Sequence, residues 1–474
     1  MTQNSTPTSE DHLDPEPDVE AMSPVERRAS FSLAGIFSLR MLGLFMILPV
    51  FSLHAHEYAG YTPLLTGLAI GIYGLTQAIF QIPFGMLSDR IGRKKVIVAG
   101  LIIFAVGSVV AALADTIWGV IAGRALQGLG AIAAAVLALT ADLTREEQRT
   151  KAMAIIGVSI GFSFALAMII GPAVTGTRLG IPGLFWLTAL LTLVGIAVLI
   201  FYVPDPAVTQ FHRDTEPVPA QFARILGNPQ LLRLDLGILI LHLIMTATFV
   251  VLPLILRDQA GITAGQHWMM YLLVVSLSVA LMAPFVMLAD RNNRLKHVFL
   301  GAVVLLFFAE VGLFRYESGL LQIAVLLVLY FTAFNVLEAT LPSLVSRLAP
   351  SDMKGTALGA YSTAQHMGAF AGGAIGGSVY GAYGASATFG ICAALAVLWL
   401  AVAAGMRNPP PISTYLLKLG PVSPQEAEAT EARLLAVTGV AEAVVVVEDG
   451  VAYLKVDRRV LDRGALRAIS TTSA

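Results

Sequence analysis

The chain has 474 residues, of which 56% are hydrophobic and only 13% are charged, and its mean hydropathy is +0.77. Soluble domains carry about 25% charged residues, so this composition predicts that most of the chain lies in a lipid bilayer. The net charge of −1 gives no general attraction to nucleic acid, and a single cysteine, Cys392, excludes an intramolecular disulfide and disfavours a cysteine-based metal site.

The first twenty or so residues are polar and acidic. They lack the order of a cleavable signal, in which charged residues precede an apolar run. We therefore expect residues 1–28 to form a disordered cytoplasmic tail.

Twelve apolar runs are long enough to cross a bilayer as helices, which takes about 20 residues. They fall near residues 31–53, 64–86, 96–114, 118–141, 151–174, 183–203, 232–256, 268–289, 297–314, 320–346, 355–380 and 385–405. The cations of the intervening loops gather on one side, and only Arg178, Arg257 and Arg315 lie on the other. Since cytoplasmic loops carry the excess of Lys and Arg, both termini are predicted to be cytoplasmic.

A proline-rich stretch at 204–230 interrupts the array and predicts a cytoplasmic linker. It separates one set of six spans, at 29–203, from a second set, at 231–407. The fold predicted for these residues is an all-α polytopic membrane protein built from two six-helix bundles.

The two halves also repeat short motifs. The stretch Phe45–Val50 is echoed by Phe249–Leu254, and Pro83–Arg90 is echoed by Pro284–Arg291. Parallel repeats of this kind are typical of transporters that rock two halves around a central site.

After Arg407 the composition becomes soluble in character. Residues 408–413 form a proline-rich spacer, and residues 414–474 are predicted to form a small cytoplasmic α/β domain. Its expected order is strand, helix, hairpin and helix, a ferredoxin-like sandwich without a clear fourth strand, in the segments Thr414–Leu419, Ser423–Gly439, Val440–Glu448, Val451–Val456 and Arg459–Ser470. This domain contains no cysteine or histidine, so we expect it to regulate or scaffold without binding a metal and, through an open sheet edge, to self-associate.

The first candidate functional stretch is the loop Gly85–Lys95, between the second and third spans. Gly85 and Gly92 permit tight backbone geometry, and Asp89 is the one anion beside Arg90 and Arg93. Asp89 is placed to meet the positive N-terminal dipole of the eleventh helix, near Lys354–Thr356, and so to join the two halves on the cytoplasmic side. The alternative is a surface ion pair with Arg90 or Arg93, which contributes little.

Polar groups in the fourth span form the second candidate. Arg124 and Gln127 are three residues apart and share a helix face. Arg124 either snorkels to water at its end of the span or faces a central cavity beside a proton-carrying acid.

The fifth span ends in the Gly171–Pro172 motif, whose simplest interpretation is a kinked helix that packs closely through small residues. Five other intramembrane polar residues are candidates because burying such groups in lipid is costly: Arg40, His242, Glu310, Asn335 and Glu338. Glu338 and Asn335 share a face, and Glu338 is either a proton carrier or a hydrogen-bonding partner between helices. Glu310 lies about a turn from the outer end and His242 near mid-span, which favours structural roles for both. Arg40 needs an acceptor, and the first span contains no acid.

The segments Gly85–Lys95, Arg124–Gly130 and Gly171–Pro172 together resemble the drug–proton antiporter branch of the major facilitator superfamily. The resemblance implies proton-driven efflux of a small, drug-like solute from a bacterial inner membrane. It also implies that Asp89 latches the outward-facing state and that Arg124 and Gln127 serve proton coupling. From its position inside a span we count Glu338 among the proton-coupling candidates, and we expect no cofactor. The chain departs from the pattern at Thr175, where a glycine is usual, and in lacking the acid that many such antiporters carry in the first span.

Two other functions remain open. A proton-coupled importer shares the architecture, and a membrane sensor would signal through the C-terminal domain. The absence of a nucleotide-binding loop motif disfavours ATP-driven transport and catalysis, so we expect a protein that is not an enzyme.

Overall fold

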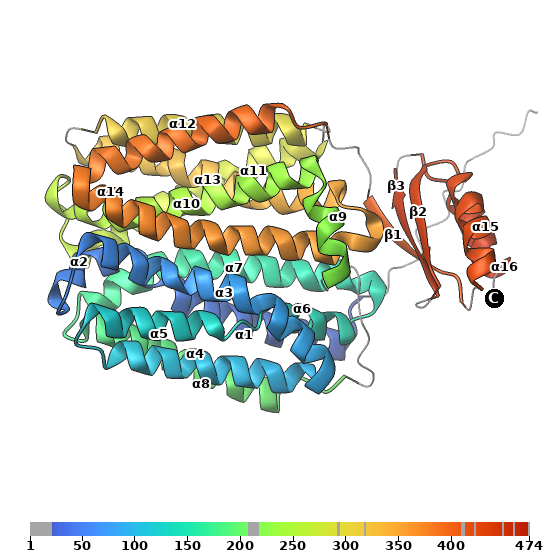
Figure 1. The fold of residues 1–474 in the computed structure, drawn as a ribbon, viewed down its shortest axis with the longest axis horizontal. Coiled ribbons are helices and arrows are strands. Elements are labelled where there is room, and N and C mark those ends of the chain that lie inside the picture. The colour runs from blue at the N-terminus through green and yellow to red at the C-terminus, as the bar shows by residue number, and fades with distance from the viewer. Residues whose placement is uncertain are drawn as a thin grey trace, which may run out of the picture.

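The computed structural model describes residues 21–206, 218–291, 294–316, 319–408, 413–420, 423–447, 450–457 and 460–472. Long helices run side by side, and a small α/β unit lies at one end of them (Figure 1). We call the end of the helices next to this unit the domain side and the opposite end the far side.

The first half consists of seven longer helices. They are α1 (Pro24–Phe45), α3 (Pro63–Ile91), α4 (Arg93–Ala112), α5 (Ile117–Leu129), α6 (Ala133–Asp142), α7 (Glu146–Thr175) and α8 (Gly180–Phe201), with the short α2 (Phe51–His54) on the far side. The fourth predicted span is not continuous, because the chain leaves helical geometry between α5 and α6.

The second half begins after the short α9 (Phe222–Leu226). Its helices are α10 (Pro229–Asp258), α11 (His267–Arg291), α12 (Leu295–Phe314), α13 (Leu320–Leu348) and α14 (Lys354–Ala404). A turn of 3₁₀ helix, η4 (Ser351–Met353), connects α13 to α14, and another, η2 (Pro219–Gln221), precedes α9.

Among the described residues, ten helical segments are long and apolar enough to cross a membrane, with α5 and α6 counted as one. The 51-residue α14 bends at Gly384, where φ is 80°, so it makes two crossings. With α1, which holds the first predicted apolar run, the described helices account for the twelve predicted spans.

The two halves meet along α3 and α14. Within this contact a Cβ atom on Gly67 would overlap the carbonyl oxygen of Gly373, so only glycine allows the two backbones to approach this closely. Gln81 adds hydrogen bonds, donating to Thr363 Oγ1 at 2.7 Å and accepting from Ser362 Oγ at 3.0 Å.

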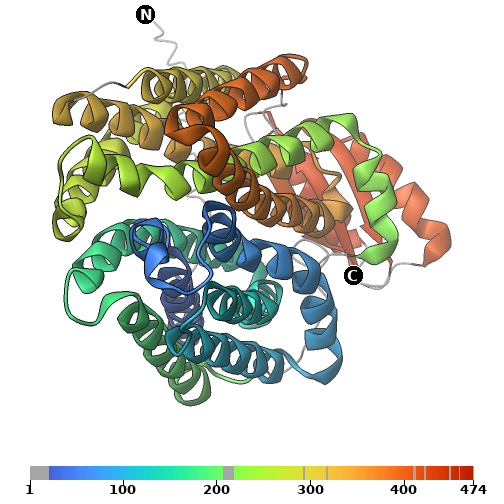
Figure 2. The same ribbon diagram turned by 60° about the vertical axis from the view of Figure 1, so that its left-hand side comes forward.

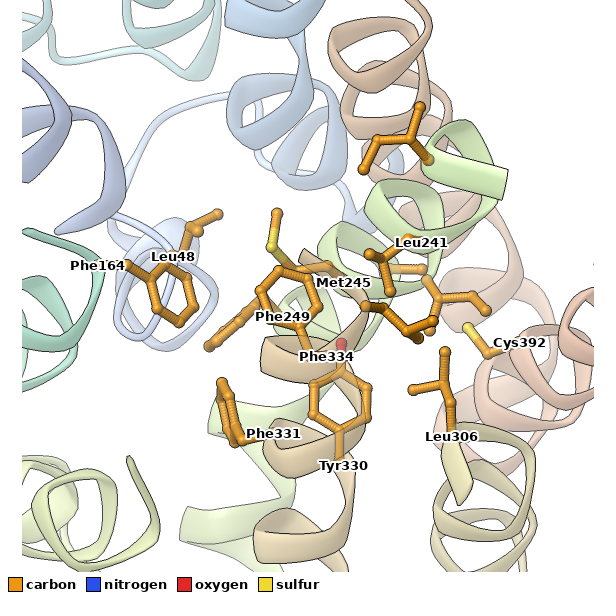
Figure 3. Close-up of a cluster of buried hydrophobic side chains, with 14 of the residues drawn as sticks. Leu48, Phe164, Leu241, Met245, Phe249, Leu306, Tyr330, Phe331, Phe334 and Cys392 are labelled. Carbon is orange, nitrogen blue, oxygen red and sulfur yellow. The ribbon is translucent and has the colours of Figure 1, made fainter. Parts of the chain in front are cut away.

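An aromatic cluster joins the halves nearer the far side. Phe164 of α7 lies 6.4 Å from Phe249 of α10, and 6.2 and 5.9 Å from Phe331 and Phe334 of α13, measured between ring centroids. Figure 3 shows these rings converging with Leu48 and Met245. Aromatic burial of this extent stabilises the contact between the halves.

The C-terminal unit contains β1 (Ser413–Lys418), α15 (Pro424–Leu435), β2 (Val440–Val446), β3 (Val451–Val456) and α16 (Arg463–Thr472). The strands form an antiparallel sheet in the order β1-β3-β2. Figure 2 shows this unit beside the second half from another direction. The predicted strand–helix–hairpin–helix order is present, although part of the predicted hairpin turn lies outside the described residues.

Candidate functional site

A polar cluster lies in the middle of the second half, where α10, α13 and α14 meet. Glu338 Oε1 is 3.5 Å from His242 Nε2, and the amide Nε2 of Gln365 is 2.9 Å from the same ring nitrogen. Since the amide nitrogen donates, His242 Nε2 accepts that hydrogen bond. The side chain of Glu338 is 30% exposed although it lies mid-helix, whereas its Oε1 atom is buried and has no hydrogen-bond partner in the described part of the chain.

Helices α10 and α14 carry two further polar groups, which lie closer to the domain side. Asp235 precedes His242 by seven residues on α10, so these two side chains share a helix face. Tyr361 precedes Gln365 by four residues on α14 and shares a face with it. Asp235 Oδ2 and the Tyr361 hydroxyl have no hydrogen-bond partner in the described part of the chain. Sequence reasoning missed Asp235, Tyr361 and Gln365. Asp235 was detectable as an acid within an apolar run, whereas the other two depend on knowing that α14 packs beside α10.

Asn335 and Glu310 are separate from this cluster. Asn335 Nδ2 donates to Ser278 Oγ at 3.2 Å and so ties α13 to α11. Glu310 is completely buried and accepts from Thr248 Oγ1 at 3.2 Å, which fixes it in the packed interior of the second half. The two carboxyls therefore differ in exposure, because the side chain of Glu338 is 30% exposed and Glu310 is completely buried.

Arg40 and Arg124 are each 1% exposed in the first half, and both lie close to the ring of Tyr73. The guanidinium carbons of Arg40 and Arg124 lie 5.7 and 5.3 Å from the centroid of that ring. Arg40 Nη2 donates to Gln77 Oε1 at 2.8 Å and to the carbonyl of Gly130 at 3.1 Å, where the chain breaks between α5 and α6. Amide and backbone oxygens thus supply the acceptors that the first span lacks.

Arg124 does not snorkel to water. Its Nη1 donates to Gln127 Oε1 at 2.7 Å, and its Nε and Nη2 reach the carbonyls of Ala69 and Ile70 in α3 at 3.4 Å. Gln127 Nε2 donates in turn to Ser108 Oγ at 2.8 Å. The predicted Arg124–Gln127 pair is therefore the centre of a network that joins α3, α4 and α5.

The loop between α3 and α4 places Asp89 beside Arg93, with which it forms an ion pair. Arg93 also donates to Ser88 Oγ at 3.0 Å and to Asp142 Oδ2 at 3.3 Å. Gly92, with φ of 103°, supplies the left-handed turn between the helices, while Arg90 is exposed.

In this conformation Asp89 does not reach the start of α14. The hydroxyl of Thr356 there accepts from the amide of Val218 and donates to Gln221 Oε1, both at 2.9 Å. Asp89 instead adopts the alternative left open by the sequence, an ion pair with Arg93. The latch between the halves thus remains a prediction for another conformation.

The Gly171–Pro172 motif lies near the far end of α7, which continues through Pro172 to Thr175. A Cβ atom on Gly171 would lie 2.5 Å from the carbonyl oxygen of Met46. Thr175 Oγ1 donates to the carbonyl of Gly171 at 3.0 Å. The motif thus packs α7 closely against the end of α1.

Comparison with known proteins finds two matching family models and several relatives. A family model described as the Major Facilitator Superfamily matches residues 33–373 and 234–435, and one described as the YajR YAM domain matches residues 421–469. The chain is 47% identical over 442 residues to the inner membrane transport protein YajR of Escherichia coli (strain K12), covering 93% of this chain and 97% of that protein. It is 26% identical over 336 residues to the multidrug resistance protein MdtH of Aeromonas hydrophila, covering 67% and 79% of the two chains.

Solved structures share the fold at low sequence identity. A bacterial homologue of the human lysosomal transporter Spinster, in an inward-facing and unoccupied conformation, has a TM-score of 0.65 and 14% identity, covering 80% of this chain and 96% of that one. The human organic anion transporter MFSD10 has a TM-score of 0.61 and 19% identity, covering 80% and 100%. The chain belongs to the Major Facilitator Superfamily and is a multi-pass membrane transport protein, not an enzyme.

Proposed function

We propose that this protein exports a small solute across the bacterial inner membrane in exchange for protons, and that Glu338 carries the proton. The observation that carries the proposal is the setting of Glu338, a mid-membrane carboxyl that is 30% exposed within the bundle and 3.5 Å from His242. A partly exposed carboxyl within a membrane-spanning helix, with a titratable histidine beside it, is suited to exchange a proton as the two halves move.

Transport also depends on how rigidly the first half is packed, and this is the contribution of Arg124, Gln127 and the Gly171–Pro172 motif. The first two fix α5 against α3 and α4, and the motif fixes α7 against α1. All of these helices belong to the first half, so the contacts let that half move as a unit relative to the Glu338 site in the second half.

The direction of transport and the orientation in the membrane rest on charge and on relatives. The cationic loop Gly85–Lys95 lies on the domain side, and under the positive-inside rule this supports a cytoplasmic location for that side and for both termini. A relative named as a multidrug resistance protein supports export of a drug-like compound.

The test compares two carboxyl variants in inverted membrane vesicles loaded with a panel of solutes. Glu338→Gln should lose solute accumulation driven by a pH gradient but retain solute–solute counterflow, which moves no net proton. The matched control Glu310→Gln alters a carboxyl that is completely buried, and it should retain both activities. If Glu338→Gln accumulated solute at the normal rate under a pH gradient, Glu338 would not be the proton carrier. If the solute moved in the same direction as the protons, the protein would be an importer.

A further inference from the structure

The sheet of the C-terminal domain has two apolar faces, although the domain's own helices cover only one. Side chains alternate between the faces along each strand. Ala443, Val445, Ala452, Leu454 and Val456 pack with Leu434 of α15 and with Leu466 and Ile469 of α16. The residues between them belong to the other face.

On β2 and β3 that other face, which we call the helix-free face, consists of Glu442, Val444, Val446, Val451, Tyr453 and Lys455. In a two-layer α/β unit standing alone, such a face would be open to water and would be expected to be polar. Here four of these six positions are apolar or aromatic, and Tyr453 is only 5% exposed. Lys455, also buried, is neutralised by Glu442 at 2.8 Å.

The cover comes from the transporter half of the same chain. Figure 1 shows the sheet between the helical bundle and α15 with α16, so the helix-free face is turned toward the bundle. The connector η4 packs against both β2 and β3. Its last residue, Met353, is at the same time buried in the hydrophobic core of the transporter.

This connector leads directly into α14, the helix that crosses α3 at Gly67 and Gly373. We propose that the helix-free face is a docking surface for η4, and that through this contact the C-terminal domain holds the domain-side end of α14. The occupant is a segment of the same chain, so the surface serves an intramolecular interface and is not available to a second copy.

The experiment measures amide hydrogen exchange of the full-length protein in lipid nanodiscs. Tyr453→Asp places a charge in the middle of the docking surface and should raise exchange at 349–360 and in β3 at least tenfold. Tyr415→Asp is the matched control, because it makes the same substitution at an exposed position of β1, outside that face. It should leave exchange at 349–360 unchanged.

Deletion of residues 409–474 provides a second test that does not depend on the folding of a domain variant. It should raise exchange at 349–360 to the level of Tyr453→Asp, while α10 and α12 stay protected. Unchanged exchange at 349–360 in the deletion variant would overturn the proposal, since the connector would then not be covered by the domain. The proposal would equally be overturned if Tyr453→Asp left 349–360 protected while α15 and α16 remained folded.

Discussion

Glu26 offers a quantitative test of how the first helix is fastened to the bundle. Its carboxylate accepts from the amide of Arg145 at 2.8 Å, from Arg145 Nε at 3.0 Å and from Arg145 Nη2 at 3.1 Å. It also accepts from the amide of Ser23 at 2.8 Å, which completes a capping box at the start of α1. The hydrogen bonds from Arg145 are the main reason that the pKa of Glu26 is lowered from 4.5 to about 2.

This lowered pKa sets the size and the pH dependence of the effect. One pKa unit corresponds to about 1.4 kcal/mol, so the shift has a ceiling of roughly 3 kcal/mol. The side chain of Arg145 is 42% exposed and solvent screens the pair, so we expect a loss of roughly 1–3 kcal/mol in Glu26→Gln at pH 7. Because the folded-state pKa is the lower one, the stabilisation is complete above about pH 4.5 and disappears as the pH falls toward 2.

The assay is thermal unfolding in detergent at pH 7 and pH 3, with hydrogen exchange in the first turn of α1. The matched control is Glu57→Gln, whose carboxylate is 54% exposed and pairs only with His54 in the described structure. Glu26→Gln should be the less stable of the two variants at pH 7, and the difference in stability between them should be smaller at pH 3. Equal stability of the two variants at pH 7, or a gap that does not change with pH, would refute this reasoning.

Three further predictions concern transport. Gly67→Ala should abolish solute flux, because its Cβ overlaps the Gly373 carbonyl at the contact between the halves and forced overpacking costs about 1–3 kcal/mol. The control is Gly301→Ala, whose Cβ meets open space and which should transport normally. Arg124→Ala should abolish proton-coupled flux but still insert into the membrane, as measured by vesicle transport and surface expression; normal flux would reduce Arg124 to a dispensable contact. Asp89→Asn should raise cysteine labelling from the domain side, because a contact of about 0.3–2 kcal/mol with the start of α14 is lost in the latched state; unchanged labelling would contradict the latch.

Much of the fold was predictable because the bilayer imposes a length on each apolar run. The break in the helix at Gly130, between α5 and α6, was not predictable, because the residues around it are apolar and a continuous helix satisfies the same hydropathy pattern. The structure explains the break through Arg40, whose guanidinium binds the Gly130 carbonyl. That contact spans 90 residues of sequence, and no local pattern encodes it.

Some residues of the candidate site were predictable one by one, but their assembly was not. Helical spacing correctly placed Arg124 and Gln127 within hydrogen-bonding distance on one helix. It gave no indication that Glu338 of α13 would lie beside His242 of α10, because helix periodicity does not specify which faces of different helices meet. For the same reason the contact of His242 with Gln365, in a glycine-rich stretch of α14, could not be predicted.

The central claim, exchange of solute for protons, is tested most directly by proton movement in inverted vesicles containing the wild-type protein. A respiration-driven pH gradient is followed with a fluorescent dye, and solutes from a panel are then added in turn. We predict that at least one solute dissipates the gradient with wild-type protein and fails to do so with Glu338→Gln. A solute that is transported by the wild-type protein while leaving the pH gradient unchanged would contradict the claim.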